Sequence, residues 1–446
     1  MKNQSIWQKN AALPGFAPLS GDESVHTVII GGGLTGLLTA RLLREQGVHA
    51  LVLEAGRIGG GQTGRTTAKI TSQHDLILAD LIDRIGEDAA RQYVQANEAA
   101  IDNYAQMIRR GRIDCGFTPC SAYLYSTAES SPLQQEMAAA RRLGVDAAFT
   151  RETELPFPVA GALRFRRQAR FHPLRFLAAI AEGLDIREQT RVLQAEEDRI
   201  HTDRGTVRAE HIVFACHYPF VNAPGWYFPR MHQERSYVLA LQTRWLPRDV
   251  YLGVDGDGLS LREAGGQLLL GGSGHRTGEN PDGGQFEALR SAAKALFPDA
   301  RETARWSAQD VVTVDRMPCI GQYARSRPGW YVATGFAKWG MTTAMAAARI
   351  ITGMIAGHVP EYADVFSPQR PVLTAGNMKP LLNETGHALR GLIPGTDGPR
   401  CAHLGCALVW NPEEQSWDCP CHGSRFAEDG TLLDGPAQTD LALGEP

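Results

Sequence analysis

The C-terminal part of the chain carries two short cysteine–histidine segments whose spacing restricts what it can fold into. One residue separates Cys401 from His403, fifteen residues follow His403, and two residues then separate Cys419 from His422. Two cysteine thiolates can hold one iron of a [2Fe–2S] cluster while two histidine nitrogens hold the other. Cysteine and histidine at short spacings also suit a tetrahedral structural zinc site. A metal centre is therefore predicted in this region.

The residues around these positions favour the iron–sulfur cluster over zinc. The stretch WNPEEQSWDCPCHGSRF at 410–426 and Gly-Pro-Ala at 435–437 resemble the cluster-binding lobe and the proline loop of disulfide-type Rieske proteins from respiratory cytochrome bc complexes. Ser424 matches the hydroxyl donor to cluster sulfur in that family, whereas Phe426 stands where high-potential relatives carry tyrosine. An absent O–H donor leaves the sulfur charge less stabilised, so an intermediate reduction potential is expected. The resemblance also implies a ligand set and a cross-link, namely Cys401, His403, Cys419 and His422 on the irons and a disulfide between Cys406 and Cys421.

Near the N-terminus a glycine-rich turn lies between a predicted strand and a predicted helix. An apolar run leads into Gly31, Gly33 and Gly36, and a second apolar strand at 50–53 ends in Glu54. In this context the pattern indicates dinucleotide binding, because the helix N-terminus offers N–H groups to a pyrophosphate and the acidic residue accepts from ribose hydroxyls. Gly31 allows the tight turn, Gly33 lets the pyrophosphate approach, and Gly36 lets helix and strand pack closely.

Further segments resemble the D-amino-acid-oxidase-like flavoproteins, which include glycine oxidase and sarcosine oxidase. They are a second glycine-rich segment at 57–67, the strand that begins at Val192, the strand at 212–217, and the segments at 315–321 and 334–343. Their order along the chain matches the family, so the resemblance implies FAD rather than NAD. The residues implied to bind FAD are Gly31, Gly33, Gly36, Glu54, Arg57, Gly60, Thr63, Val192, Ala215, Gly335, Gly340, Met341 and Thr342.

Composition and targeting signals restrict the partners and the location. Of the 446 residues 43% are hydrophobic and 21% are charged, which is ordinary for a globular protein. A net charge of −4 argues against nucleic acid or an acidic membrane surface as a partner. We see no export signal in residues 1–21 and no run that is apolar enough for a transmembrane segment, and the remaining cysteines are scattered. The expected location is the cytoplasm.

The expected fold is an α/β, Rossmann-like FAD-binding domain with an interleaved antiparallel substrate-binding sheet (α+β) and a small all-β Rieske module. The inserted segments alternate apolar and polar residues as antiparallel strands do, and the stretch before the cysteines is rich in Pro, Gly and Asn. The expected boundaries are 25–75, 140–225 and 310–366 for the FAD-binding domain, 76–139 and 226–309 for the substrate-binding domain, 367–397 for a linker and 398–446 for the Rieske module.

The electrons for the cluster are expected to come from an organic substrate. A reductase that takes electrons from NAD(P)H would need a second strand–turn–helix segment for the nicotinamide dinucleotide, and we find none. By resemblance the substrate is a small-molecule amine or amino acid, oxidised at the carbon next to nitrogen. The predicted function is a FAD-dependent dehydrogenase that passes electrons one at a time through its own [2Fe–2S] cluster to an external acceptor protein or quinone.

Three residues are candidate catalytic residues, namely Lys338, His275 and His74. Lys338 lies in the segment expected beside the flavin, where a cation would stabilise the reduced ring, and His275 follows a strand of the substrate sheet. His74 is expected either to face the ring or to be a hydrogen-bonded structural histidine. Arg262 would clamp a carboxylate, although an arginine on a strand is more often a solvated edge charge. The residues proposed to contact substrate are Tyr237, Tyr251 and Arg262.

Two other functions stay open at this point. In the first, the chain is an amine oxidase that uses oxygen directly, and the Rieske lobe is mainly structural. In the second, the chain is a redox sensor or an electron-transfer partner whose flavin pocket turns over little. Anaerobic reduction with a panel of amines separates these functions, because only the relay bleaches the flavin first and the cluster second.

Overall fold

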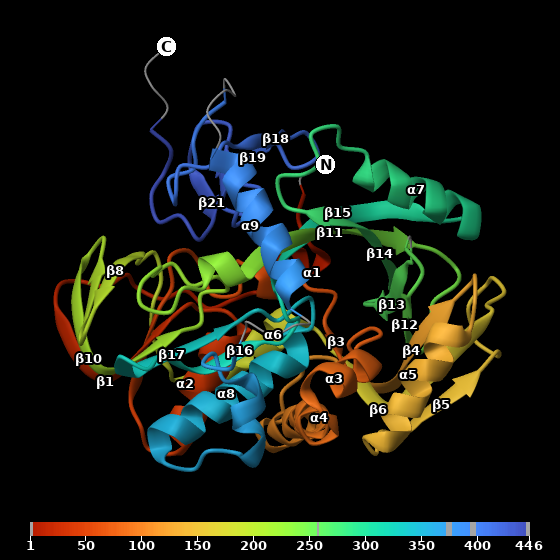
Figure 1. Ribbon diagram of the computed structural model, residues 1–446, viewed down its shortest axis with the longest axis horizontal. Helices are drawn as coiled ribbons and strands as arrows, with labels where there is room; N and C mark the ends of the chain where they lie inside the picture. The colour runs from red at the N-terminus through yellow and green to blue at the C-terminus, as the bar shows by residue number, and fades with distance from the viewer. Residues whose placement is uncertain (1–2, 257, 372–376, 393–397, 443–446) are drawn as a thin grey trace.

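A largely parallel sheet forms the first layer of the molecule. The computed structural model describes residues 3–256, 258–371, 377–392 and 398–442. Helices α2 (Leu34–Glu45) and α8 (Gly340–Ala356) pack against each other beneath this sheet, at the lower left of Figure 1. Its strands follow the order β16 (Cys319–Ala324), β17 (Arg327–Thr334), β10 (Gly205–Phe214), β1 (Glu23–Ile30), β2 (Ala50–Leu53) and β7 (Asp185–Arg187), and β9 (Arg199–Thr202) and β8 (Val192–Glu196) extend it beyond β10.

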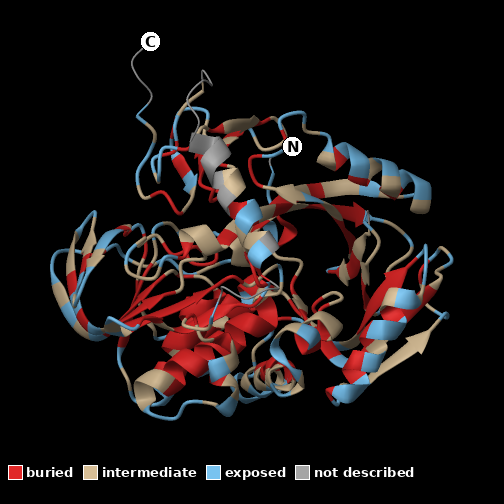
Figure 2. Ribbon diagram, in the orientation of Figure 1, coloured by how far each residue is buried: buried red, intermediate tan, exposed pale blue. Residues whose placement is uncertain are grey.

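Burial explains why these strands have nearly continuous apolar sequences. In β2 all four residues are buried, and in β1 the last four residues are buried. A parallel sheet that is covered on both faces is expected to show such runs rather than alternation. Figure 2 shows the resulting core, in which the strands of the first sheet and the inner faces of α2 and α8 are buried together.

The second sheet lies on the right of Figure 1 and is mainly antiparallel. Strands β11 and β15 are paired over their whole length, with Glu234 opposite Asp310 and Arg235 opposite Gln309. The β12–β4 pair is parallel. In order, the strands are β15 (Arg301–Thr313), β11 (Met231–Gln242), β14 (Gln267–Arg276), β13 (Ser260–Ala264), β12 (Val250–Gly253), β4 (Thr118–Ser126), β6 (Gly161–Arg170) and β3 (Lys69–Ile70), and β5 (Ala147–Thr150) pairs with β6.

The second sheet takes in more of the chain than the sequence indicates. Strands β5 and β6 belong to it, although both lie in the range 140–225 that was expected in the FAD-binding domain. Strand β6 pairs with β4 from Gly161 to Arg170, so the chain returns to the first sheet only after β6. Sequence alone does not distinguish two such strands of the second sheet from strands of the dinucleotide fold, because both kinds are short and partly apolar.

The remaining helices surround the two sheets. The 25-residue α4 lies beneath the junction of the sheets and packs against α8. In the described ranges no helix combines the length and the apolar character that crossing a bilayer requires. These elements are α1 (Ile6–Asn10), α3 (Leu78–Ile85), α4 (Glu87–Gly111), α5 (Ser131–Arg142), α6 (Pro173–Ile180) and α7 (Gln285–Leu296), with the 3₁₀ helices η1 (Gln62–Gly64), η2 (Phe228–Arg230) and η3 (Glu361–Phe366).

The segment expected as a linker contains a helix. Helix α9 spans Met378–Leu392 and contacts η2. Pro380 lies in its first turn, where a proline costs no intrahelical hydrogen bond. Asn377 and Pro380, two of the residues that suggested a connector, therefore stand at the start of the helix, and the Asn377 carbonyl accepts from the N–H of Leu381 at 2.9 Å.

A small all-β unit follows α9 and confirms the expected C-terminal module. We call residues 398–442 the cluster lobe; it lies at the top of Figure 1. It has its own core, which includes Leu408, Phe426 and Leu432. Its strands β18 (Val409–Asn411), β19 (Ser416–Asp418), β20 (Arg425–Ala427) and β21 (Leu432–Asp434) pair in that order, each antiparallel to the next.

Candidate functional site

A large cavity lies between the two sheets and extends to the cluster lobe. Its volume is about 1990 Å³, well above the ~300–1,000 Å³ of a pocket for one drug-sized ligand. Its walls come from both glycine-rich segments, from β11, β14 and β15, from α9, and from residues between 432 and 438 of the cluster lobe. A cavity of this size has room for a dinucleotide and a substrate together.

The first glycine turn leaves space at the N-terminus of α2. Gly31 has a φ of +115°, and a Cβ there would lie 2.5 Å from the Ala215 carbonyl oxygen, so only glycine fits. A Cβ on Gly33, the N-cap of α2, would meet within 4 Å only the Thr63 hydroxyl, at 3.3 Å. The Leu34 N–H donates to that hydroxyl at 2.9 Å, and the positive end of the helix dipole faces the open space. This turn fits the pyrophosphate of FAD.

The carboxylate of Glu54 stands at the end of β2 in the same part of the cavity. Its two oxygens accept from the N–H groups of Gly32 and Gly56, each at 2.7 Å. Burial raises the pKa of Glu54, and the two backbone hydrogen bonds oppose that rise. Each oxygen keeps a second lone pair, so the carboxylate can also accept from ribose hydroxyls.

Most residues predicted to bind FAD line this cavity, and two do not. A Cβ on Gly36 would overlap the Gly31 carbonyl oxygen, so this glycine allows α2 to approach the turn. Thr342 is buried and donates its hydroxyl to the Thr71 carbonyl at 3.0 Å, so it supports the wall from behind. The residues that line the cavity are Gly31, Gly33, Glu54, Arg57, Gly60, Thr63, Val192, Ala215, Gly335, Gly340 and Met341.

Lys338 brings a cation to the cavity wall beside two acidic groups. Its ammonium pairs with Glu234 at 2.8 Å, and Glu234 stands opposite Asp310 on the paired strands. Hydrogen bonds from His232 and Lys338 hold the pKa of Glu234 below its ordinary value. Burial raises the pKa of Asp310 to about 6. Because Lys338 and Glu234 neutralise each other, Asp310 adds a negative charge to this part of the cavity wall at neutral pH.

His275 and Tyr237 form a hydrogen-bonded pair on the same wall. His275 Nδ1 donates to the Arg276 carbonyl at 2.7 Å, so Nε2 of the neutral ring accepts from the Tyr237 hydroxyl at 3.0 Å. Burial lowers the pKa of His275, which keeps the ring neutral near pH 7. Both residues line the cavity, where they can contact substrate.

His74 and Tyr251 are not among the residues that line the cavity. His74 is 1% exposed, donates from Nε2 to the Thr71 carbonyl at 2.9 Å and accepts at Nδ1 from the Tyr93 hydroxyl at 2.5 Å. This geometry matches the structural alternative for that histidine rather than a place facing the ring. Tyr251 stacks on Tyr123 in the core of the second sheet, with ring centroids 4.8 Å apart, and not against the cavity.

Arg262 is buried, in contrast to the expected carboxylate clamp or solvated edge charge. Its guanidinium donates to the carbonyl of Thr67 at 2.6 Å and lies 5.4 Å from the centre of the Trp7 ring. A buried guanidinium with these partners holds the backbone of the second glycine-rich segment in place. The sequence pattern did not reveal this role, because the accepting carbonyl is 195 residues away.

The motif analysis missed several charged residues of the cavity wall, of which two have a perturbed pKa that bears on the site. The Lys69 ammonium hydrogen-bonds to the Ser260 hydroxyl, and burial, helped by the nearby Arg262 charge, lowers the pKa of Lys69 to about 7. Asp310 is the second. In each case the available signal was a single charged residue within a strand, which sequence alone cannot separate from a solvated edge charge.

In the cluster lobe the four predicted ligands fit the donor set of a [2Fe–2S] cluster. A hydrogen bond between the Cys401 and Cys419 sulfurs lowers the pKa of Cys401 and raises the pKa of Cys419. The rings of His403 and His422 have centroids 5.0 Å apart. Both Nδ1 atoms are buried and lack a hydrogen-bond partner within the described residues. Two adjacent sulfurs and two unpartnered ring nitrogens are what two irons of this cluster require.

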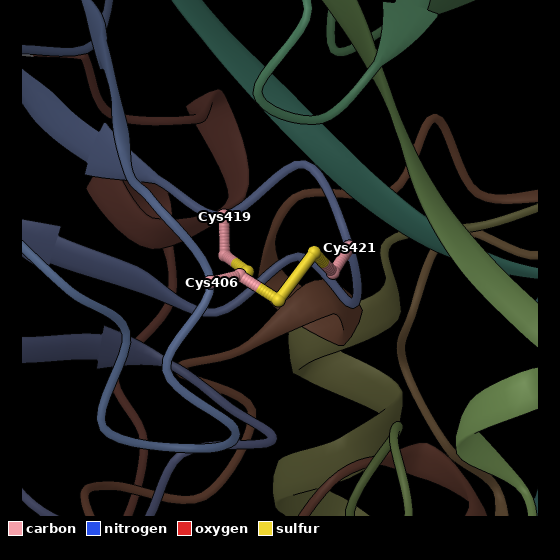
Figure 3. Close-up of side chains that lie close together, drawn as sticks. All are labelled: Cys406, Cys419 and Cys421. Carbon is pink, nitrogen blue, oxygen red and sulfur yellow. A yellow bond between two sulfur atoms is a disulfide. The ribbon is translucent and has the colours of Figure 1, made fainter. Parts of the chain in front are cut away.

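Cys406 and Cys421 form a disulfide that ties the two ligand loops (Figure 3). Their Cα atoms are 6.7 Å apart, and the Cys419 side chain points toward the bond (Figure 3). The sulfurs of these three cysteines lie within 4.8 Å of one another. Since Cys406 and Cys421 are bonded to each other, Cys401 and Cys419 are the thiols available to iron in this lobe.

Two buried glutamines join the cluster lobe to the cavity. Gln233 Nε2 donates to the His422 carbonyl at 2.7 Å, and Gln309 Nε2 donates to the Gly423 carbonyl at 2.8 Å. The backbone N–H of Gln309 also donates to the side-chain oxygen of Gln62 at 2.8 Å. Because Gln62 lines the cavity, only one residue of the second sheet separates the cavity wall from the ligand loop.

Comparisons with known proteins agree with both parts of the site. The sequence model of the FAD dependent oxidoreductase (DAO) family matches residues 26–354, and that of the Rieske [2Fe-2S] domain matches residues 397–443. YhfW of Bacillus subtilis (strain 168), named as a Rieske 2Fe-2S iron-sulfur protein, is 32% identical over 97% of this chain and 96% of its own length. Gamma-glutamylputrescine oxidoreductase of Escherichia coli (strain K12) is 23% identical over 79% of this chain and 88% of that protein. The crystal structure of glycine oxidase from Geobacillus kaustophilus has a TM-score of 0.68 at 19% identity, covering 78% of this chain and 99% of that one.

Proposed function

The chain belongs to the FAD dependent oxidoreductase (DAO) family and carries a C-terminal Rieske [2Fe–2S] domain, and from this premise we propose that it is an amine or amino-acid dehydrogenase whose electrons leave through its own cluster lobe. The external acceptor is proposed to be a one-electron carrier, either a protein or a quinone. The proposed location is the cytoplasm, which the unpaired state of the scattered cysteines supports.

The observation that carries this proposal is the shared wall between the cavity and the cluster lobe. Leu432 to Gly435 line the same cavity as Gly31 and Lys338. Gln309 contacts Gln62 on the cavity side and Gly423 in the ligand loop. A lobe with a purely structural role would have no need to face the cofactor cavity. The direct contact supports electron transfer between the two sites.

When bound, FAD would accept two electrons from the substrate and the cluster would carry one at a time. The residues of the chain prepare the site for that chemistry. Asp310 on β15 offers a carboxylate to the ammonium of a substrate, while Lys338 pairs with Glu234, which stands opposite Asp310 on β11. His275 is held neutral with both ring nitrogens bonded, one to the Arg276 carbonyl and one to the Tyr237 hydroxyl, so the pair offers the substrate a fixed, uncharged wall.

The names of similar proteins support a substrate that contains nitrogen. One relative is named for gamma-glutamylputrescine, and the similar crystal structure is that of glycine oxidase. A carboxylate in the cavity whose pKa lies near 6 suits a cationic amine group of such a substrate. The proposal includes both amines and amino acids.

Anaerobic mixing with a panel of amines and amino acids tests the proposal. For an active substrate we expect the flavin absorbance to bleach first and the cluster absorbance second, followed by turnover with cytochrome c as the one-electron acceptor. The variant Cys419→Ser removes a ligand, so its flavin should still bleach while turnover with cytochrome c falls at least 100-fold. Cys120→Ser, which changes a thiol in β4 of the second sheet, is the matched control.

Each contrary result points to one of the other functions. Rapid peroxide formation in air, unchanged by Cys419→Ser, would indicate an oxygen-using oxidase with a structural lobe. Flavin that no compound in the panel reduces, together with a cluster that exchanges electrons readily with partner proteins, would indicate a sensor or a transfer partner.

A further inference from the structure

The side of the cluster site that carries the two histidines faces the FAD-binding module, by which we mean the first sheet with its helices and connecting loops. The segment between β10 and η2, residues 215–227, passes in front of both ligand rings, and we call it the histidine-facing loop. His422 is buried, and the rings of Tyr218 and Phe228 stand edge-on to it with centroids 6.3 and 5.7 Å away. The two histidines are therefore enclosed by residues that lie some 200 positions earlier in the chain.

Asn222 in this loop makes a direct hydrogen bond with a ligand ring. Its Oδ1 lies 3.0 Å from Nε2 of His403. The other ring nitrogen of His403, Nδ1, is buried and has no partner within the described residues. A neutral imidazole that gives the lone pair of Nδ1 to iron carries its proton on Nε2. Nε2 of His403 is then the donor and the Asn222 amide oxygen is the acceptor.

His422 is enclosed from the same part of the chain. Its ring stands edge-on to that of Phe228, the residue that follows the loop. Its Nδ1 is also buried and unpartnered within the described residues. Both ligand rings thus keep Nδ1 without another partner among the described residues, and His403 also presents Nε2 to the histidine-facing loop. Asn222 is the member of this arrangement that acts through a side chain and can be exchanged.

We infer that Asn222 is a positioning residue that orients the His403 ring and lowers the reduction potential of the cluster. A carbonyl oxygen that accepts from the distal N–H makes a ligating imidazole more basic. A more basic ligand stabilises the oxidised, more positive cluster relative to the reduced one. The FAD-binding module would in this way adjust the potential of the acceptor that its own flavin feeds. The inference concerns the potential of the cluster and goes beyond the proposed substrate chemistry.

Potentiometric titration of the full, cluster-loaded protein tests this role without any substrate. Asn222→Leu removes the acceptor at similar size, and we expect the one-electron equilibrium constant for cluster reduction to rise about tenfold, which is ~59 mV. Asn222→Asp keeps the shape and adds negative charge, so the constant should fall by a similar factor. Ala223→Ser alters the next, exposed residue of the loop and should leave the potential unchanged. The EPR spectrum of the reduced cluster should change in the first two variants only.

The order of the potentials decides the outcome. A potential that is highest for Leu, intermediate for Asn and lowest for Asp supports the inference. Equal potentials, or a shift in the same direction for Leu and Asp, would overturn it, since a loosened loop has no reason to respond to the sign of the charge. If both variants fail to retain a cluster, Asn222→Gln, which keeps the amide, and Asn222→Ala are compared. Loss of the cluster in these as well would assign Asn222 a structural role and also overturn the inference. A failure of the proposed dehydrogenase function leaves this measurement untouched, because dyes rather than an amine set the potential.

Discussion

Removal of the Cys406–Cys421 disulfide should speed the loss of the cluster without preventing its assembly. The bond closes a loop with a sequence separation of 15 residues. In the chain-entropy model a loop of this length is worth ~3 kcal/mol. While the cluster is bound, its four ligands already hold the same two loops together. The disulfide therefore restricts mainly the open state, in which the ligands no longer bind iron, and raises the free energy of that state. The disulfide therefore opposes the opening step through which the cluster leaves.

The double variant Cys406→Ser with Cys421→Ser measures that effect. If the full ~3 kcal/mol acts on opening, the opening equilibrium rises by up to ~150-fold, and the cluster absorbance should bleach faster in air by a factor of that order or less. The flavin absorbance of the same sample is the internal reference. Cys120→Ser, in β4 of the second sheet, should bleach at the wild-type rate. Because the four ligands are unchanged, freshly prepared double variant should contain one cluster per chain.

Two results would refute this reasoning. Equal bleaching rates for the double variant and the wild type would mean that the cross-link does not limit opening. Alkylation of both thiols in cluster-loaded wild-type protein without reductant would mean that Cys406 and Cys421 are not bonded in solution. In a reducing compartment most thiols stay reduced, but these two cysteines are buried, which slows the attack of cellular thiols on the bond.

Other substitutions test the two halves of the site and their junction. Gly33→Val places two methyl groups at the open end of α2, and the purified protein should lack the yellow colour of a flavin; full flavin content in its absorption spectrum would contradict the pyrophosphate site. Arg235→Met removes one of the two cationic partners of Glu414, from a buried ion pair with an N–O distance of 2.9 Å, while Arg425 of the lobe remains as the other. The cluster lobe should then open ~2 kcal/mol more easily, seen as faster amide exchange in the lobe. Unchanged exchange would argue against the junction. Phe426→Tyr adds a hydroxyl that can donate to a cluster sulfur, so the reduction potential of the cluster should rise by about 60 mV, the equivalent of ~1.4 kcal/mol. Potentiometric titration measures this change, and a lowered potential would show that the hydroxyl does not reach a sulfur. Burial raises the pKa of Asp310 to about 6, so its carboxylate forms as the pH rises through that value. The amine concentration that gives half-maximal flavin reduction should therefore fall over the same pH range. Asp310→Asn should remove this pH dependence and weaken amine binding about tenfold at pH 8.

Local motifs were sufficient to predict the parts of the site that lie close together in sequence. Gly31 and Glu54 are recognisable because the turn, the helix end and the acidic residue each depend on neighbours within about two dozen positions. The cluster ligands are recognisable for the same reason. Contacts between distant segments were not predictable. Arg262 bonds to a carbonyl 195 residues away, and no periodicity in its own strand indicates whether such a partner exists.

The orientation of the cluster lobe on the rest of the chain depends on residues that belong neither to the glycine-rich turn nor to the cysteine–histidine segments. Gln233 and Gln309 are 1% and 0% exposed, and a buried amide is costly unless it is hydrogen-bonded. Three of their four sequence neighbours on β11 and β15 are polar or charged, so the sequence pattern reveals neither that these amides are buried nor that their acceptors are backbone carbonyls of the cluster loop. Since the lobe has a core of its own, apolar burial at the junction is not what holds the lobe together. The polar contacts of Gln233, Gln309 and Asn222 therefore help to specify how the lobe docks, together with the Arg235–Glu414 ion pair. A foreign Rieske domain grafted at residue 398 should therefore fold yet receive electrons slowly, unless its ligand loop presents the same carbonyls and ring nitrogen to these three side chains.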